Sequence, residues 1–312
     1  MGQQGLKLLG VLAACVLAIP QAAAQDKIRL GLLPFSESLP AVIAQQKGFF
    51  KAQGLDVEIT QVQSGAQAVP VLQAGKLDIV LSNTVTTLQA MEAGLDATIV
   101  APGAAARTKG PDTSSAIMVL KDGPIKAVKD LEGKRVATNI INSTNWLYTL
   151  AFLEKHGVDV KKVRFVEIPF PQMNDPLLNH QVDAIGQVEP FRTILEGTGK
   201  ANVLGFTYVD VQPNGDITQF LALTPWVRKN AAAARKFAQA IVQGAQYLNT
   251  NEAAARDANL QFTKLNPALK DKVMLPYFAS AVSVQEIQRT QDLMIRYGLM
   301  KQPVNVAQRV LQ

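Results

Sequence analysis

One segment of the sequence occurs twice, and this duplication restricts the fold more than any other feature. The motif Gly-Leu-Asp-Val at 54–57 recurs as Gly-Val-Asp-Val at 157–160, an offset of 103 positions. Asp78 recurs as Asp183 at an offset of 105, and each is preceded six positions earlier by a leucine. A chain that repeats itself at a fixed spacing builds the same supersecondary unit again. The sequence therefore predicts two similar lobes.

Strands and helices alternate in both copies of the repeat. The first copy predicts strands at 27–32, 55–62 and 77–81 with helices at 41–51 and 66–74, and the second predicts strands at 134–137, 163–168 and 182–185 with helices at 144–155 and 174–179. Helices that separate short apolar strands in this way indicate βαβ units and parallel sheets. We therefore expect an α/β protein with two similar doubly wound lobes and a ligand cleft between them.

Two turn-rich segments separate the predicted lobes. The first runs from Pro102 to Ser115, and the second is Gln-Pro-Asn-Gly-Asp at 212–216. No third copy follows, because the remaining sequence predicts helices at 231–248, 252–262, 268–278 and 284–297. We expect these helices to pack on the first lobe, so that lobe 1 comprises residues 25–112 and 213–312 and lobe 2 comprises 113–212. Two crossings at a hinge permit closure around a ligand.

The first 24 residues predict a cleaved secretory signal peptide. Lys7 precedes an apolar run at 8–19, and Ala-Ala-Ala at 22–24 provides a small-residue cleavage site. The run is shorter than the ~20 residues that a membrane-spanning helix needs. In an alternative interpretation, Leu-Ala-Ala-Cys at 12–15 is a lipobox and Cys15 carries a lipid. The apolar run continues past Cys15, which favours the ordinary signal, and both interpretations place the protein in the periplasm.

Composition and motifs argue against nucleic-acid binding and catalysis. The chain is 48% hydrophobic with a net charge of +6, and its basic residues are scattered rather than clustered. His156 and His180 are its only histidines, and its one cysteine lies in the predicted leader. Two histidines without a cysteine in the mature chain make a transition-metal site improbable. The chain has no phosphate-binding or nicotinamide-binding glycine motif and no nucleophile elbow. We expect neither enzymatic activity nor a cofactor.

Candidate ligand-binding residues follow the predicted strand ends, where open parallel sheets bind their ligands. The candidates are Phe35, Ser36, Ser64, Gly65, Ser82, Asn83, Thr84, Asn142, Ser143, Thr144, Trp146 and Glu189. Any one of the Ser, Thr and Asn residues is also an ordinary helix N-cap, so the prediction depends on the whole set. Trp146 either packs in the core or stacks on the ligand. Glu189 either accepts a hydrogen bond from the ligand or pairs with an arginine.

Four stretches, at 46–57, 73–79, 130–134 and 188–191, resemble the periplasmic substrate-binding proteins of ABC importers. The similarity is to the nitrate, sulfonate and taurine group, which also includes binders of thiamine precursors, and it covers nearly the whole mature chain. The family's Glu-Pro-Phe position corresponds to Glu189, Pro190 and Phe191. His180 is a departure, because many members have glycine there.

The resemblance implies a monomer that captures a small molecule, closes by hinge rotation and delivers it to an ABC permease and ATPase at the inner membrane. Our ligand hypothesis is an anionic head, such as a sulfonate, bound by helix N–H groups at 64–65 and 83–84 and by the hydroxyls of Ser143 and Thr144. Glu189 would then bind a donor at the other end of the ligand. Phe35 and Trp146 would cover its apolar body, and Arg107 is the nearest basic candidate.

Other ligands and roles stay open. Within binding, the alternatives are a nitrate-like anion and an aminopyrimidine or other aromatic solute. A periplasmic sensory domain would bind its ligand without transport. An enzyme that makes the thiamine pyrimidine is disfavoured, because such relatives depend on His and Cys residues that the mature chain lacks.

Overall fold

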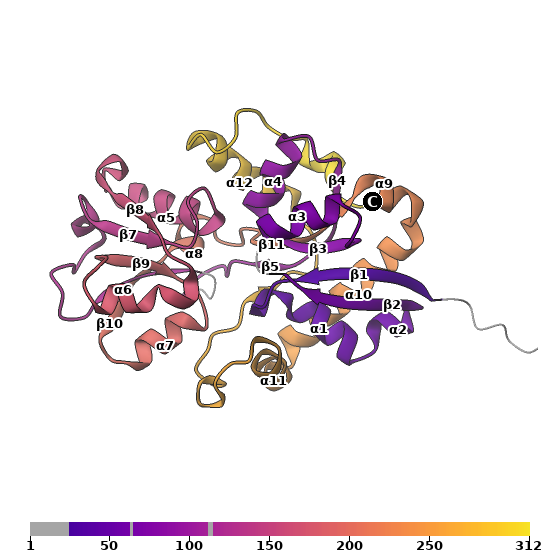
Figure 1. The fold of residues 1–312 in the computed structure, drawn as a ribbon, viewed down its shortest axis with the longest axis horizontal. Coiled ribbons are helices and arrows are strands. Elements are labelled where there is room, and N and C mark those ends of the chain that lie inside the picture. Colours follow the sequence, from indigo (N-terminus) through magenta and orange to yellow (C-terminus); the bar gives the residue numbers. More distant parts are fainter. Residues whose placement is uncertain (1–24, 63–64, 112–114) are drawn as a thin grey trace, which may run out of the picture.

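The repeated segments fold into two five-stranded sheets that lie side by side (Figure 1). The structure is a computed structural model that describes residues 25–62, 65–111 and 115–312. The first sheet has the strand order β2-β1-β3-β11-β4, and the second has the order β10-β6-β9-β7-β8. Lobe 1 denotes the first sheet with the helices packed on it, and lobe 2 denotes the second sheet with its helices.

The strands of lobe 1 are β1 (Asp26–Leu32), β2 (Leu55–Gln61), β3 (Ile79–Asn83), β4 (Ala97–Pro102) and β11 (Thr218–Leu223). Its helices are α1 (Leu39–Gln46), α2 (Phe49–Ala52), α3 (Gly65–Gln73), α4 (Thr84–Glu92), α9 (Thr224–Lys229), α10 (Ala231–Thr250), α11 (Glu252–Thr263) and α12 (Val284–Arg296). A separate ribbon pairs β5 (Ala104–Ala105) with β12 (Tyr277–Phe278).

The strands of lobe 2 are β6 (Ala116–Leu120), β7 (Arg135–Thr138), β8 (Arg164–Glu167), β9 (Ala184–Gln187) and β10 (Ala201–Phe206). Its helices are α5 (Thr144–Lys155), α6 (Asn174–Leu178), α7 (Phe191–Gly197) and α8 (Thr207–Val211). Short 3-10 turns lie at Ser36–Ser38, Val128–Leu131, Val160–Lys162, Phe170–Gln172, Pro267–Leu269 and Val306–Arg309.

The predicted duplication is confirmed in atomic detail. In lobe 1, Asp78 accepts hydrogen bonds from the backbone N, Nε and Nη2 of Arg29. In lobe 2, Asp183 accepts from the same three nitrogens of Arg135. Each carboxylate thus fixes the start of the third strand in its copy of the repeat to the first strand of that copy, in the same way. The conserved order of the elements gives the two lobes the same parallel core of three strands.

The expected parallel sheets are confirmed for the three-stranded cores alone, because each complete sheet is mixed. β11 is antiparallel to β3 and β4, and β6 is antiparallel to β9 and β10. Each antiparallel strand is the first one that the chain forms after it crosses from the other lobe. The repeat contains only the parallel strands, so its pattern gave no signal for β4, β6, β10 and β11.

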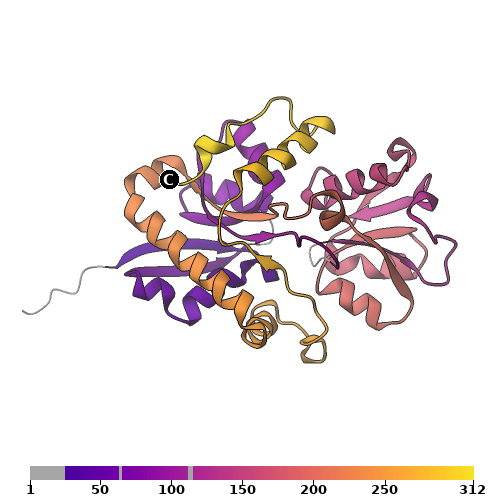
Figure 2. The same ribbon diagram turned by 180° about the vertical axis from the view of Figure 1, so that it is seen from behind.

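The C-terminal helices pack on lobe 1 as expected, and Figure 2 shows α10 along the back of its sheet. Phe237 of α10 stacks on Phe50 with 5.4 Å between ring centroids and contacts Phe220 of β11 edge-on. α12 also reaches lobe 2, where Thr290 lies 3.0 Å from the hydroxyl of Tyr148 in α5. Within the described part of the chain, no helix is long and apolar enough to span a membrane.

Two predicted helices differ from the structure. The helix expected at 268–278 is wrong: a short 3-10 turn that begins at Pro267 and an irregular segment lead into β12, and Pro276, inside the expected span, has no N–H for a helical hydrogen bond. The helix expected at 41–51 divides into α1 and α2 at Gly48, which has a left-handed φ of 74°. β3 extends two residues beyond its predicted end, so Ser82 and Asn83 are strand residues.

Candidate functional site

The carboxyl ends of the strands in lobe 1 face those in lobe 2, and two contacts join the facing edges. Phe35, which follows β1, meets Phe170, which follows β8, edge-on with 6.4 Å between ring centroids. Thr144 Oγ1 of α5 donates to Asn83 Oδ1 of β3 at 2.8 Å. Four of the predicted strand ends therefore converge on one interlobe surface, and an aromatic pair and a polar pair link its two sides.

On the lobe 1 side, Ser36 and Ser82 are buried and bonded within their own lobe. Ser36 Oγ donates to Asn259 Oδ1 of α11 at 2.8 Å, and both side chains are buried. The one contact of Ser82 Oγ within the described part of the chain is a long one, 3.4 Å to the carbonyl of Asn83. Ser64 lies outside the described residues, and the adjacent Gly65 begins α3.

Asn83 has two roles at the start of α4. Its Oδ1 accepts from Thr86 N at 2.8 Å, which caps the helix, and the same atom accepts from Thr144. Thr84 lies deeper, with its hydroxyl within hydrogen-bond distance of Gln219 Oε1 and of both the carbonyl and the carboxylate of Asp216. Burial raises the pKa of Asp216 to about 8, so this carboxyl is protonated at neutral pH.

On the lobe 2 side, the predicted hydroxyl loop is largely a helix cap. Ser143 Oγ accepts from Trp146 N at 3.3 Å and donates to Asn139 Oδ1 at 3.0 Å. Asn142 is exposed in a left-handed turn with a φ of 64°. The ring of Trp146 contacts Phe165 edge-on, and its buried Nε1 has no partner among the described residues.

Glu189 is buried and paired with an arginine, which was one of its two predicted roles. Its carboxylate accepts from Arg192 Nη2, from Thr193 N at 3.2 Å and from Thr193 Oγ1 at 3.0 Å. A fourth contact, at 3.4 Å, comes from the backbone N of Met274 in lobe 1. The carboxylate is thus held by protein groups on several sides.

Some residues of this surface were missing from the predicted site. Phe170 had a usable signal, because it follows a predicted strand in the same way as Phe35. Gln219, Asp216 and Met274 gave no signal, because they lie outside the repeat and reach the interlobe surface only through the return of the chain to lobe 1. Ser115, whose Oγ accepts from Asn145 Nδ2 at 2.8 Å, lies at the first crossing.

The charge of this surface is neutral to acidic. The segments that follow the strand ends, at 33–38, 62–66, 82–84, 139–143, 168–172 and 187–191, contain no lysine or arginine. Arg107, the nearest predicted basic candidate, donates to the carbonyl of Leu275 at 3.0 Å. It lines a groove of about 780 Å³ on lobe 1, which contains none of the predicted ligand-binding residues.

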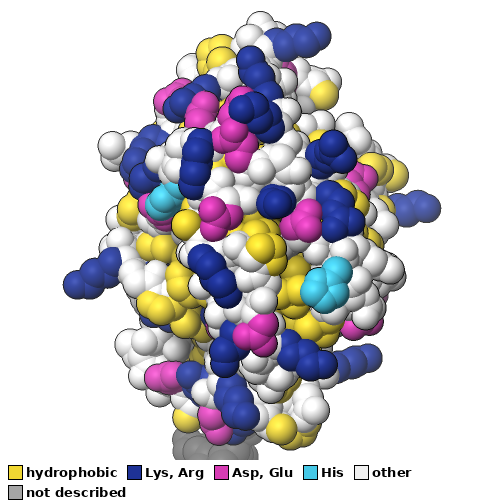
Figure 3. Space-filling model, turned by 90° about the vertical axis from the view of Figure 1, so that its left-hand side faces the viewer, with side chains coloured by type: hydrophobic (Ala, Val, Ile, Leu, Met, Phe, Trp, Pro, Cys, Tyr) yellow, Lys and Arg dark blue, Asp and Glu magenta, His cyan; other side chains and the backbone are white. Residues whose placement is uncertain are grey.

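The described parts of the chain contain no metal-binding cluster, and the one face drawn in Figure 3 has a mixed charge. No cluster of three or more His, Cys, Asp and Glu side chains that could hold a metal ion occurs among the described residues. On the end of the molecule formed by lobe 2, lysine and arginine side chains are interspersed with acidic and apolar ones (Figure 3). This face has no continuous basic patch.

The architecture and the facing strand ends define the fold of the periplasmic binding proteins. The periplasmic aliphatic sulphonate binding protein SsuA from Escherichia coli shares it, with a TM-score of 0.76 at 19% identity over 92% of both chains. The periplasmic nitrate-binding protein NrtA from Synechocystis PCC 6803 gives 0.72 at 15% identity, over 92% of this chain and 86% of its own.

The chain belongs to the NMT1/THI5-like family, whose sequence profile matches residues 36–255. A Haemophilus influenzae protein named for thiamine biosynthesis is 26% identical over 261 residues, which are 81% of this chain and 79% of that protein. The resemblance to the nitrate and sulfonate group is therefore confirmed for the family and the fold.

Proposed function

We propose that this protein is an extracytoplasmic solute-binding protein that closes its two lobes on a small organic solute and presents it to an ABC permease. The observation that carries the proposal is the meeting of the strand ends of both lobes through Asn83–Thr144 and Phe35–Phe170. Groups on facing lobes that bind one ligand favour the closed form by the difference in affinity between the two states. The relatives named as periplasmic binding proteins support this role rather than an enzymatic one.

For this cycle we propose the division into lobes that the sequence predicts, with residues 25–112 and 213–312 in lobe 1 and 113–212 in lobe 2. The strand order supports this division, because β4 and β5 precede the first crossing and β11 follows the second. Export to the periplasm as a monomer completes the proposal, and cleavage would follow residue 24.

The first ligand class is a small organic anion of the sulfonate, taurine or nitrate type. The names of SsuA and NrtA support it. α3 starts at Gly65, four positions after the last residue of β2, and the free N–H groups of such a helix start support the binding of an anionic head there. Binding would then depend on neutral donors, since the strand-end segments carry no basic side chain.

A second ligand class, an aminopyrimidine or another flat aromatic solute, is favoured by the Phe35–Phe170 pair. Two rings from opposite lobes provide apolar faces and edges against which a planar ligand can pack. In addition, Asn83 and Ser143 already cap the starts of α4 and α5, which leaves fewer helix N–H groups for an anion. The name of the Haemophilus influenzae relative agrees with this class.

Thermal unfolding of the mature protein, stripped of bound ligand by unfolding and refolding, tests both classes. The panel contains sulfonates, taurine, nitrate, aromatic carboxylates and aminopyrimidines. A ligand of the native state at 100 times its Kd stabilises it by about 2.7 kcal/mol. A panel without any stabilising member contradicts the proposed function for these ligand classes.

Variants then separate the two ligand classes. We expect Phe35→Leu and Phe170→Leu to weaken binding of an aromatic ligand more than binding of a sulfonate. Phe49→Leu is the matched control, because Phe49 contacts Tyr247 within lobe 1 and neither residue belongs to the candidate site. If all three variants lose the same affinity for the aromatic ligand, the Phe35–Phe170 pair has no special role in its recognition.

A further inference from the structure

Glu189 is held in place by three donors of its own lobe. Its side chain is 4% exposed, and Arg192, with 6% exposure, forms the ion pair. The backbone N and the hydroxyl of Thr193 bond the two carboxylate oxygens. These groups all belong to the start of α7, so they keep the carboxylate in one orientation whatever lobe 1 does.

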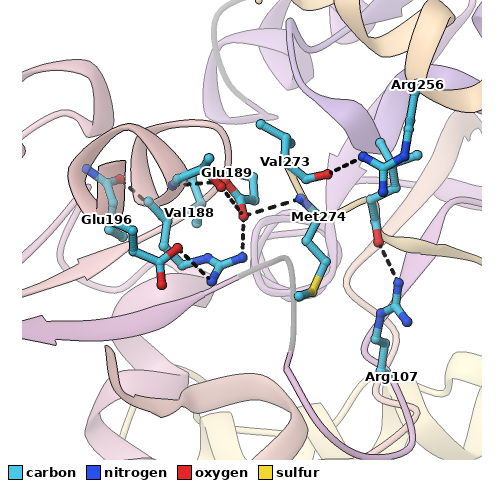
Figure 4. A network of polar contacts seen from close by, with 11 residues as sticks. Arg107, Val188, Glu189, Glu196, Arg256, Val273 and Met274 are labelled. Atoms are coloured by element: carbon cyan, nitrogen blue, oxygen red, sulfur yellow. Dashed lines mark hydrogen bonds and ion pairs between the residues drawn. The ribbon is translucent and has the colours of Figure 1, made fainter. Parts of the chain in front are cut away.

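The fourth donor belongs to lobe 1. Met274 N lies 3.4 Å from Glu189 Oε1 (Figure 4). Met274 lies in the irregular segment 264–276, which joins α11 to β12. The next residue, Leu275, is buried in the core of lobe 1 with Phe237 and Phe278. The contact between Glu189 and Met274 is therefore a contact between lobes.

Two arginines of lobe 1 fix the segment that carries this donor. Arg256 Nη1 of α11 donates to the carbonyls of Lys270 and Val273, both at 3.0 Å. Arg107 Nη2 donates to the carbonyl of Leu275 at 3.0 Å, so the carbonyls on both sides of Met274 are held (Figure 4). The N–H of Met274 is thus presented to Glu189 from a fixed backbone.

We propose that Glu189 is the acceptor of a closure latch between the lobes, with the Met274 N–H as its donor, rather than a ligand-binding group. Three of the four donors approach Oε1, which has two lone-pair sites, and Thr193 N approaches Oε2, so Oε1 has no capacity left for a ligand. When the lobes separate, the three contacts within lobe 2 persist and only the bond to Met274 breaks. Glu189 is then a positioning residue, and this inference rests on the lobe closure of the proposed function.

Distance measurement between spin labels on the two lobes tests the latch. Lys51 of lobe 1 and Lys161 of lobe 2 are exposed. Cysteines introduced at these positions are the only ones in the mature protein, because the one native cysteine, Cys15, lies in the predicted leader. Met274→Pro removes the N–H and leaves all contacts within lobe 2 intact. We expect it to lower the ratio of closed to open molecules about fivefold without ligand, as loss of one hydrogen bond predicts. Met274→Leu keeps the N–H and should leave the ratio unchanged.

Two further variants test the latch without the introduction of a proline. Arg256→Gln releases the carbonyls of Lys270 and Val273, and we expect it to shift the lobes toward the open form. Glu252→Gln is its control, because it removes only the exposed ion pair of Arg256. Glu189→Gln keeps an oxygen acceptor, so we expect a lower melting temperature with closure retained.

The proposal is overturned if folded Met274→Pro shows the wild-type distances. If Met274→Pro does not fold, Arg256→Gln with wild-type distances overturns it instead. The proposal is also overturned if the wild-type protein shows a single distance between the spin labels that does not change, or if it has no closed population. Failure of the proposed function is a different result, in which no member of the ligand panel changes the wild-type distances or melting temperature.

Discussion

Thr144 Oγ1 donates a 2.8 Å hydrogen bond to Asn83 Oδ1, the oxygen that also accepts from Thr86 N and caps α4. One amide oxygen therefore serves a helix of lobe 1 and a helix of lobe 2. Separation of the lobes breaks the bond from Thr144 and leaves the cap in place. The contribution of the interlobe bond can be separated from that of the helix cap by changing Thr144, which takes no part in capping α4.

Thr144→Val should weaken ligand binding and leave folding nearly unchanged. Valine keeps the shape of threonine and loses only the hydroxyl, so the closed state loses one interlobe hydrogen bond. We expect the Kd of a ligand found in the panel to rise about fivefold, as a net loss of about 1 kcal/mol predicts. Titration calorimetry measures this change. Asn83→Ala is the comparison, since it also removes the cap and should lower the free energy of unfolding by about 1 kcal/mol. Unchanged affinity in Thr144→Val would show that the bond does not stabilise the bound form.

The repeat made the core of each lobe predictable, because the same local signals occur in both copies. Asp78 and Asp183 mark equivalent strand starts, and both bond the first strand of their copy of the repeat. The sequence also placed Phe35, Asn83 and Thr144 at strand or helix ends that do meet. The partners of Ser36 and Glu189 were harder to predict. Asn259 and Met274 approach from chain segments far away in sequence, and only the packing of the C-terminal elements brings them there.

Asp183→Asn should destabilise lobe 2 at neutral pH. The hydrogen bond from the Arg135 side chain, aided by the Arg135 N–H and charge, lowers the pKa of Asp183. A carboxylate with a lowered pKa contributes stability above its unfolded pKa, and this contribution is lost as the pH falls through the folded pKa. We expect the free energy of unfolding, measured with urea, to fall by about 1–2 kcal/mol at pH 7 and by less at pH 3. The exposed Asp122→Asn is the control. An equal loss at both pH values would contradict an origin in the charged pair.

His180→Gly should stabilise the protein. His180 has a left-handed φ of 58°, and Gly75, with a φ of 66°, occupies the equivalent position in the first copy of the repeat. A left-handed conformation costs a residue with a Cβ about 1 kcal/mol, and glycine avoids this cost. Because Arg135 Nη2 bonds the carbonyl of His180, the substitution keeps that contact. We expect the free energy of unfolding to rise by a few tenths to about 1 kcal/mol, reduced by the greater chain entropy of glycine in the unfolded state. Gly75→Ala should have the opposite effect, and a destabilised His180→Gly would show that the imidazole contributes more than the strain costs.

Asp216→Asn should remove a pH dependence of stability that the wild type carries. Asp216 is 3% exposed and lies beside the hydroxyl of Thr84, which is also close to Gln219 Oε1. Burial is the main cause that raises its pKa to about 8, and the negative charge of Glu286 adds to it. The folded protein therefore keeps a proton that the unfolded chain releases above a pH of about 4. Stability falls as the pH rises from there to about 8 and then levels off, because both states are ionised above that value.

Asparagine at position 216 keeps an oxygen for Thr84 and cannot ionise. We expect Asp216→Asn to be as stable as the wild type near pH 4 and more stable by on the order of a few kcal/mol at pH 8.5, since each pH unit within the window contributes about 1.4 kcal/mol at most. Urea unfolding at both pH values measures the difference, with Asp122→Asn as the control for loss of one surface carboxylate. If the variant and the wild type change in parallel between these pH values, Asp216 is not protonated in the folded protein. Its contact with Thr84 would then have to stabilise a buried negative charge at the point where the chain returns to lobe 1.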